Sequence, residues 1–203
     1  PFSGNEPLES DLLLSGDVEL TDVLFTERID WEEWLLDFRR YVDLEQVAVS
    51  EEAGLLSYNI SVAGEGAGRL RNNIAEGVCD VDLVVVGDTT SPGLTGVVRM
   101  HPGGSVVLQD REFELVRGEL RYIDPFSFDP ELNLLMRTEV ESRDESYRIE
   151  YHIDGPLTDW YSSAVSTPSL SQADINALLL FGLTRDDLER FGGVNSALLM
   201  EGA

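Results

Sequence analysis

Two histidines and one cysteine are the residues of this sequence best suited to acid–base, metal or nucleophilic chemistry. His101 stands in the turn sequence His-Pro-Gly-Gly, and His152 falls on the polar side of an alternating strand pattern. Neither histidine lies in an H-E-x-x-H, C-x-x-C or G-x-S-x-G context. Cys79 has no second cysteine to pair with, and we expect it to be a small apolar residue on an inward strand face.

The 39 acidic residues make some accidental carboxylate pairs certain, but their spacing indicates no ligand set. Asp186, Asp187 and Glu189 come nearest to a Ca²⁺ site, yet they lack the pattern of an oxygen-ligand loop. The glycine-rich run Gly64 to Gly68 lies between two strand patterns and opens no helix, so it predicts a bend or bulge instead of a phosphate loop. The sequence therefore predicts a protein that is not an enzyme and uses no cofactor or metal.

The charge balance argues against two classes of partner. The chain has 39 acidic and 14 basic residues, a formal net charge of -25, and every basic residue is arginine. Such a surface repels phosphate backbones and anionic headgroups, so we expect no nucleic acid and no electrostatic docking on a bilayer. The acidic surplus is also compatible with a salt-adapted source, where self-repulsion is screened. The sequence contains no apolar run long enough to span a membrane and opens with no signal peptide.

A long series of strand patterns positions these side chains and defines a predicted sheet domain over residues 55–166. Apolar and polar residues alternate in each run, as where Leu83 and Val85 alternate with Asp82. Pro102–Gly104 predicts a turn between two strands, and the runs PELNLLMRTEV and SYRIEYHI predict an antiparallel hairpin. One face is apolar and the other charged, which is typical of a sheet with one solvated side.

The N-terminal part, residues 1–54, predicts a strand followed by a tryptophan-rich helix. Trp31 and Trp34 belong to an apolar stripe at helical spacing, and Asp30 is the candidate N-cap. We expect this stripe to pack on a sheet end; the alternative is a contact with a protein or a membrane.

The C-terminal part, residues 167–203, predicts two short consecutive helices. Ser171 caps the first and Gly182 ends it, while Thr184 caps the second. Apolar side chains wrap most of the first helix, so another surface must bury it. The residues expected to plug the sheet or dock a partner are Ile175, Leu178, Leu179, Phe181, Leu188 and Phe191.

Five motifs, in this order, resemble the C-terminal domain of the TamB family, the translocation and assembly module subunit of diderm bacteria. They are VVVGDTTSPGLTGVV, the pattern F-x-L-x-x-G-x-L from Phe113 to Leu120, FDPELNL from Phe128 to Leu134, IDGPL from Ile153 to Leu157, and the tail STPSLSQADINALLLFG. The resemblance covers about Tyr58 to Gly182, and the N-terminal stretch is less similar. Family members continue beyond Ala203, so we expect the natural protein to extend in both directions.

The resemblance implies a β-taco: a mainly β protein with a long folded-over, antiparallel-rich sheet, an apolar inner groove, and short helices near the N-terminus and at the C-terminal end. It implies a periplasmic segment of a protein anchored in the inner membrane of a diderm bacterium. The implied partners are the POTRA domains of an outer-membrane BamA-type (TamA-like) protein, phospholipid acyl chains and nascent outer-membrane proteins. The family is linked to outer-membrane protein assembly and to phospholipid transfer between the two membranes.

Alternation alone does not separate an open lipid groove from a closed sandwich core, because both have one dry face. An acyl chain of roughly 16 carbons exposed to water loses on the order of 12 kcal/mol, at about 0.8 kcal/mol per methylene. Roughly nine strands about 4.8 Å apart give a wall about 40 Å long, enough to line one such chain. The residues expected to line the groove are Leu83, Val85, Val98, Met100, Leu120, Leu134, Met136, Ile149 and Tyr151.

Two other readings of the same alternation stay open. A scaffold with a closed core would dock the BamA-type partner or a barrel client through its sheet edges. A transmembrane barrel would need strands of about 9 to 11 residues with aromatic girdles, and most strands expected here are shorter. For the first tail helix, we expect it to close the groove; the alternative is a contact with the outer-membrane partner.

Overall fold

The computed structural model of the protein describes residues 12–28, 30, 56–108, 111–142 and 145–184. The described elements are a sheet of ten strands and one helix. In chain order they are β1 (Leu12–Glu19), β2 (Val23–Phe25), β3 (Leu56–Arg71), β4 (Ala75–Asp88), β5 (Pro92–Met100), β6 (Ser105–Leu108), β7 (Arg111–Tyr122), β8 (Glu131–Ser142), β9 (Glu145–Pro156), β10 (Tyr161–Thr167) and α2 (Gln172–Phe181).

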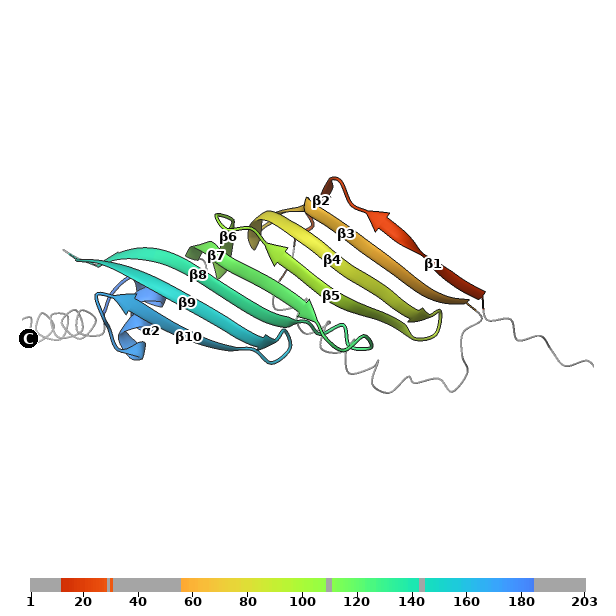
Figure 1. The fold of residues 1–203 in the computed structure, drawn as a ribbon. Coiled ribbons are helices and arrows are strands. Elements are labelled where there is room, and N and C mark those ends of the chain that lie inside the picture. Colours follow the sequence, from red (N-terminus) through yellow and green to blue (C-terminus); the bar gives the residue numbers. More distant parts are fainter. Residues whose placement is uncertain (1–11, 29, 31–55, 109–110, 143–144, 185–203) are drawn as a thin grey trace, which may run out of the picture.

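The strands form one sheet in the order β1-β3-β4-β5-β7-β8-β9-β10, which Figure 1 shows as a continuous row of arrows. From β3 onward every neighbouring pair is antiparallel, including the predicted hairpin of β8 and β9. β1 and β2 instead pair in parallel with β3. The prediction of a mainly β, antiparallel-rich protein is therefore confirmed, whereas a folded-over sheet with an inner groove is not shown.

β5 and β6 follow one another along the same position in the sheet, between β4 and β7. β4 pairs with β5 over most of its length and with β6 at its first two residues, and β7 pairs with both strands. The hydrogen-bonded pairings of β4, β5, β7 and β6 thus form a small closed ring, because β4 and β7 each pair with both β5 and β6. The turn expected at Pro102–Gly104 bends the chain between β5 and β6 without reversing its direction. The backbone N–H of Gly103 donates to Leu115 O at 2.9 Å, which keeps the bend beside β7.

Irregular backbone occurs at three neighbouring places in the sheet: in β3, in β7, and at the bend between β5 and β6. The register of β3 against β4 shifts between Gly64 and Gly68. The register of β7 against β8 shifts between Leu115 and Arg117, and the β5–β6 bend lies between these two places in the strand order. Extra residues on one strand of a pair bend that strand and increase its twist. The bulge predicted from the glycine-rich run is confirmed.

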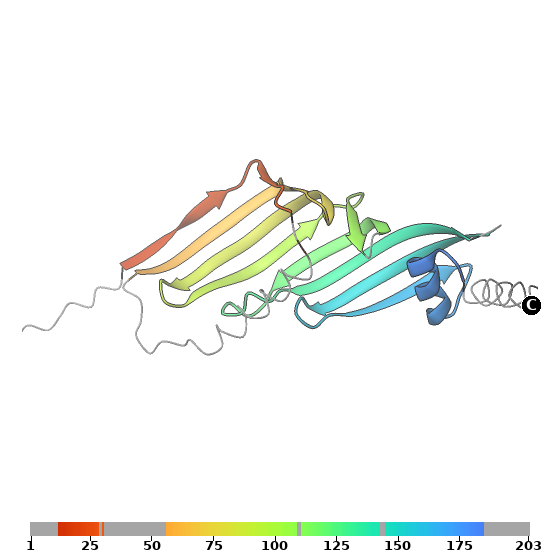
Figure 2. The same ribbon diagram turned by 180° about the vertical axis from the view of Figure 1, so that it is seen from behind.

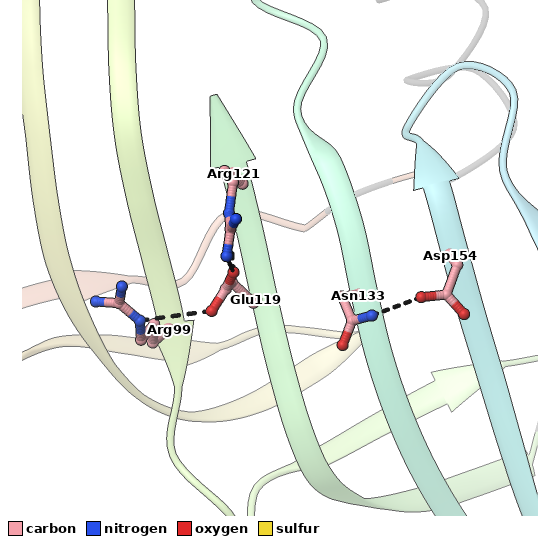
Figure 3. Close-up of polar contacts among 5 residues, drawn as sticks. All are labelled: Arg99, Glu119, Arg121, Asn133 and Asp154. Carbon is pink, nitrogen blue, oxygen red and sulfur yellow. Dashed lines mark hydrogen bonds and ion pairs between the residues drawn. The ribbon is translucent and has the colours of Figure 1, made fainter. Parts of the chain in front are cut away.

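One face of the sheet is polar. Arg99, Glu119, Asn133 and Asp154 lie in one cross-strand row from β5 to β9, shown in Figure 3. Arg99 Nε lies 3.5 Å from Glu119 Oε2, Arg121 also donates to Glu119, and Asn133 Nδ2 donates to Asp154 Oδ1 at 2.5 Å. Solvent-exposed ion pairs contribute about 0–1 kcal/mol each. The row therefore keeps this face compatible with water, and the fold depends on the other face.

α2 lies against the apolar face at the β10 end of the sheet, as Figure 2 shows from behind. The Ser171 hydroxyl accepts the backbone N–H of Asp174, and Gly182, with φ of 69°, donates its N–H to Leu178 O at 2.9 Å. These caps fix both ends of the helix. The predicted first tail helix is confirmed. The tryptophan-rich helix and the second tail helix fall on residues outside the described part of the chain.

Candidate functional site: the apolar face of the sheet

The nine residues expected to line a groove all lie on one face of the sheet. Val98 is paired with Leu120, and Met136 with Tyr151. Paired residues point to the same side, so apolar side chains continue from strand to strand in rows. One such row crosses from β4 to β9 through Cys79, Met100, Gly118, Leu134 and Ile153. The pairing therefore joins the predicted residues into one surface.

This apolar face is buried unevenly. Met136 and Ile149 are 0% exposed. The other seven of the nine keep partial exposure: Leu83, Val85, Val98, Met100, Leu120, Leu134 and Tyr151. Burial is thus deepest over β8 and β9 and shallower over β4 and β5.

Two hydrophobic clusters account for the buried part. The first consists of Phe113, Leu115, Leu132, Met136, Ile153 and Leu157, and the second of Val140, Tyr147, Ile149, Ala164, Ile175 and Leu178. Tyr151 and Leu179 pack against both clusters. Leu83, Val85 and Val98 are members of neither. The helix covers one end of the apolar face and leaves the β4–β5 end outside these clusters.

A family model described as the TamB C-terminal domain matches residues 50–203, well over half of the chain. The chain belongs to the TamB family. The resemblance drawn from the five motifs is thereby confirmed, and the protein is a cell-envelope protein related to the translocation and assembly module. Among curated proteins, none matches the chain.

α2 supplies the described members of the predicted plug in this TamB-family chain. Ile175 and Leu178 are buried against the second cluster, and Leu179 is half-buried. Phe181 is 66% exposed and does not take part in this packing. Leu188 and Phe191 lie outside the described residues. The host surface of the helix is the sheet of the same chain.

Arg111, the first residue of β7, forms hydrogen bonds with the C-terminal end of α2. Its Nε donates to Leu179 O at 3.1 Å, and its Nη2 lies 3.5 Å from Leu178 O. α2 has no basic residue in its own last turn. The guanidinium supplies, from another element, the donors and positive charge that favour a helix C-terminus.

Sequence reasoning did not assign a role to Arg111. Its partners follow it by 67 and 68 residues, so no local pattern could reveal the contact. Phe113, Leu115, Leu132 and Ile153 were also not named as lining residues, although they lie on the same face and are buried. Their strand alternation was the available signal.

The titratable groups near the β3 bulge have structural roles. Asp80 Oδ1 accepts the backbone N–H of Gly66 at 2.6 Å and lies 2.7 Å from His101 Nε2. These two hydrogen bonds hold the pKa of Asp80 below its ordinary value. Burial raises the pKa of the Cys79 thiol, with a further contribution from the Asp80 charge. The predicted inward position of Cys79 is confirmed, since it is 5% exposed.

No metal-binding group of three or more His, Cys, Asp or Glu occurs within the part of the chain that the structure describes. Asp186, Asp187 and Glu189 lie outside that part. His152 is paired with Leu135 and sits on the polar face. Among the described residues, no helix has both the length and the apolar character needed to cross a membrane.

Proposed function

We propose that the apolar face of this sheet shields phospholipid acyl chains as they pass between the inner and outer membranes. The observation that carries this proposal is the continuity of apolar residues across neighbouring strands on one face, opposite a polar face. In this proposal the protein is a periplasmic segment anchored in the inner membrane, acts without catalysis, and meets TamA-like POTRA domains near the outer membrane. In this proposal the sheet curls over the lipid as a β-taco.

The size of the face suits an acyl chain. Eight strands lie side by side from β1 to β10, and the seven spacings between them, about 4.8 Å each, make a wall about 34 Å wide. A water-exposed acyl chain loses about 0.8 kcal/mol for each methylene, so an apolar wall must be continuous to lower the barrier to movement. Contacts to aliphatic side chains are non-directional and let the chain slide.

The half-buried β4–β5 part of the face is the best place for an acyl chain. Leu83, Val85 and Val98 lie there, outside the two clusters beneath and beside α2. Ile149 is fully buried, so a charge at that position would unfold the protein and say nothing of lipid. Tests of the lipid contact therefore belong on β4.

The adjacent valines of β4 give a matched test. Val85 is on the apolar face opposite Leu94, whereas Val84 is on the other face opposite Thr95. We expect Val85→Asp to abolish binding of the fluorescent fatty acid cis-parinaric acid and to remove co-purifying phospholipid in native mass spectrometry. Val84→Asp should retain both. Circular dichroism must show both variants folded, and equal binding by the two variants would refute the lipid-shielding function.

A protein-docking scaffold is the second candidate, and the composition of β10 favours it. β10 pairs with β9 on one side, and none of its seven residues is charged. Sheet edges that must avoid pairing commonly carry charged residues or proline. In this candidate, β10 receives a strand of the TamA-like partner or of a nascent outer-membrane protein. Photoreactive residues at Ser163 should then yield protein adducts, while residues at Val85 yield no lipid adducts.

A further inference from the structure

The apolar face carries one arginine among the described strands. Residues of β7 alternate, so Arg111 lies on the same side as Phe113, the most buried aromatic residue there. The other arginines of the described strands fall on the polar side; Arg148, for example, pairs with Glu139 at 3.1 Å on that face. A guanidinium on a dry face needs acceptors, and the carbonyl groups of Leu178 and Leu179 in α2 accept hydrogen bonds from Arg111.

The contact with Arg111 is concentrated at one end of the helix. The last four carbonyl groups of a helix lack partners in the helix itself. Gly182 satisfies Leu178 O through its backbone N–H, and Arg111 adds bonds to Leu178 O and Leu179 O. The neighbouring Leu180 and Phe181 are 55% and 66% exposed. Arg111 therefore holds the end of α2 that apolar packing secures least.

α2 covers side chains of the kind that an acyl chain would contact. Ile175 and Leu178 share the second cluster with Ile149, and Leu179 packs against the first cluster, as do Tyr151 and Leu134. Three of these sheet residues, Ile149, Tyr151 and Leu134, are among the nine expected to line the groove. Aliphatic side chains of a helix and methylene groups of a lipid bury the same surface with similar energy per unit area.

We infer that α2 and an acyl chain compete for the β8–β9 end of the apolar face, and that Arg111 latches α2 in the occupied position. This inference rests on the proposed lipid-shielding function and adds its regulation. Release of the Arg111 hydrogen bonds frees the C-terminal turn of α2 first. The half-buried β4–β5 surface then becomes continuous with the surface that the helix leaves.

A thiol reporter measures the latch without lipid. Ala177 in α2 is 8% exposed, so Ala177→Cys in a Cys79→Ala background reports each opening of the helix through its rate of labelling by a thiol reagent. Charge-assisted hydrogen bonds stabilise enough for their loss to raise the open fraction by about tenfold or more. We expect Arg111→Gln to accelerate labelling by about that factor. Arg148→Gln removes the same charge from the polar face and should leave the rate unchanged.

Binding of cis-parinaric acid then tests competition. Arg111→Gln should bind the fatty acid more tightly than the unaltered protein, and the fatty acid should accelerate labelling at Ala177→Cys. Circular dichroism checks that the fold is kept. If Arg111→Gln does not fold, Arg111→Lys serves instead, because it keeps the charge but not the forked donor geometry and should give a smaller acceleration.

The outcomes separate the latch from the lipid-shielding function. Unchanged labelling in a folded Arg111 variant overturns the latch. Faster labelling with unchanged fatty-acid affinity overturns the competition while the unaltered protein still binds lipid at β4. Failure of every folded variant, including the unaltered protein, to bind the fatty acid overturns the lipid-shielding function and the competition with it, even if Arg111 does hold the helix.

Discussion

Asp80 in β4 contacts His101 in the bend between β5 and β6, with 2.7 Å from Asp80 Oδ1 to His101 Nε2. The same carboxylate oxygen accepts the backbone N–H of Gly66 in the β3 bulge. The Asp80 side chain thus links the β3 bulge to the bend between β5 and β6.

Substitution Asp80→Asn should lower the melting temperature at about pH 7. The folded-state pKa of Asp80 is lowered, so its ionisation stabilises the fold above the unfolded-state pKa, near 4, and this stabilisation is lost as the pH falls through the folded-state pKa. The difference between variant and unaltered protein should therefore disappear in strong acid. Thermal unfolding followed by circular dichroism across that pH range measures it.

Asp82→Asn is the matched control for this experiment. Asp82 lies two residues further along the same face of β4 and is exposed. Removal of one negative charge from a chain with a net charge of -25 relieves repulsion, so the control should be neutral or slightly stabilising. An equal loss in both variants would contradict a specific role for the Asp80 hydrogen bonds.

Gly96→Ala should destabilise the protein by roughly 2 kcal/mol or more. Gly96 has φ of 118°, and a Cβ atom there would lie 2.2 Å from Asp82 O, a backbone atom that cannot move aside cheaply. Gly16→Ala is the control, because a Cβ atom at Gly16 meets nothing within 4 Å. Urea titration gives both free energies of unfolding, and similar values for the two variants would be evidence against the close β4–β5 approach.

Leu178→Ala should cost about 2–5 kcal/mol, the range for a fully buried leucine. Leu180→Ala, in the same helix but 55% exposed, should change stability by about 0.5 kcal/mol or less. The pair measures whether α2 is part of the cooperative fold. Loss of α2 protection in hydrogen exchange with unchanged unfolding of the sheet would show that the helix opens on its own.

Cys79 should react slowly with thiol reagents in the native protein near pH 8. Its sulfur is buried and its pKa is raised, so both access and the thiolate fraction are low. The same thiol should react at once in denaturant. Rapid, complete labelling of the native protein would mean that the β3–β4 pairing opens readily near Gly68, where a Cβ atom would lie 2.3 Å from the Cys79 sulfur.

Local periodicity predicts the faces of the strands, and long-range pairing sets the rest. The alternation around Leu83 and Val85 identified the apolar side, because a period of two needs only nearby residues. The parallel pairing of β1 with β3 cannot be predicted from local periodicity, because the paired residues are 44 positions apart in the sequence, as with Leu12 and Leu56. Side-chain contacts such as Arg111 to Leu179 have no sequence periodicity at all.

A bulge also hides continuity from the sequence. Phe113 and Leu115 occupy odd positions while Leu120 and Tyr122 occupy even ones, which predicts two short strands. The structure has one strand, β7, in which an extra residue between Leu115 and Arg117 restores the apolar side chains to the same face. The expected turn at Pro102–Gly104 was similarly a bend within one row, because Gly103 keeps a backbone hydrogen bond to β7.

The sheet's outer strands, β1 and β10, each have a side without a pairing partner among the described strands. A sheet of this kind grows by whole strands, and each added antiparallel hairpin contributes two spacings, about 10 Å. Hairpin-sized insertions would keep every side chain on its face, while a single residue inserted in a strand would turn the remainder over unless a bulge absorbs it, as in β7. The width of such a sheet is therefore set in discrete steps by the number of hairpins that it contains.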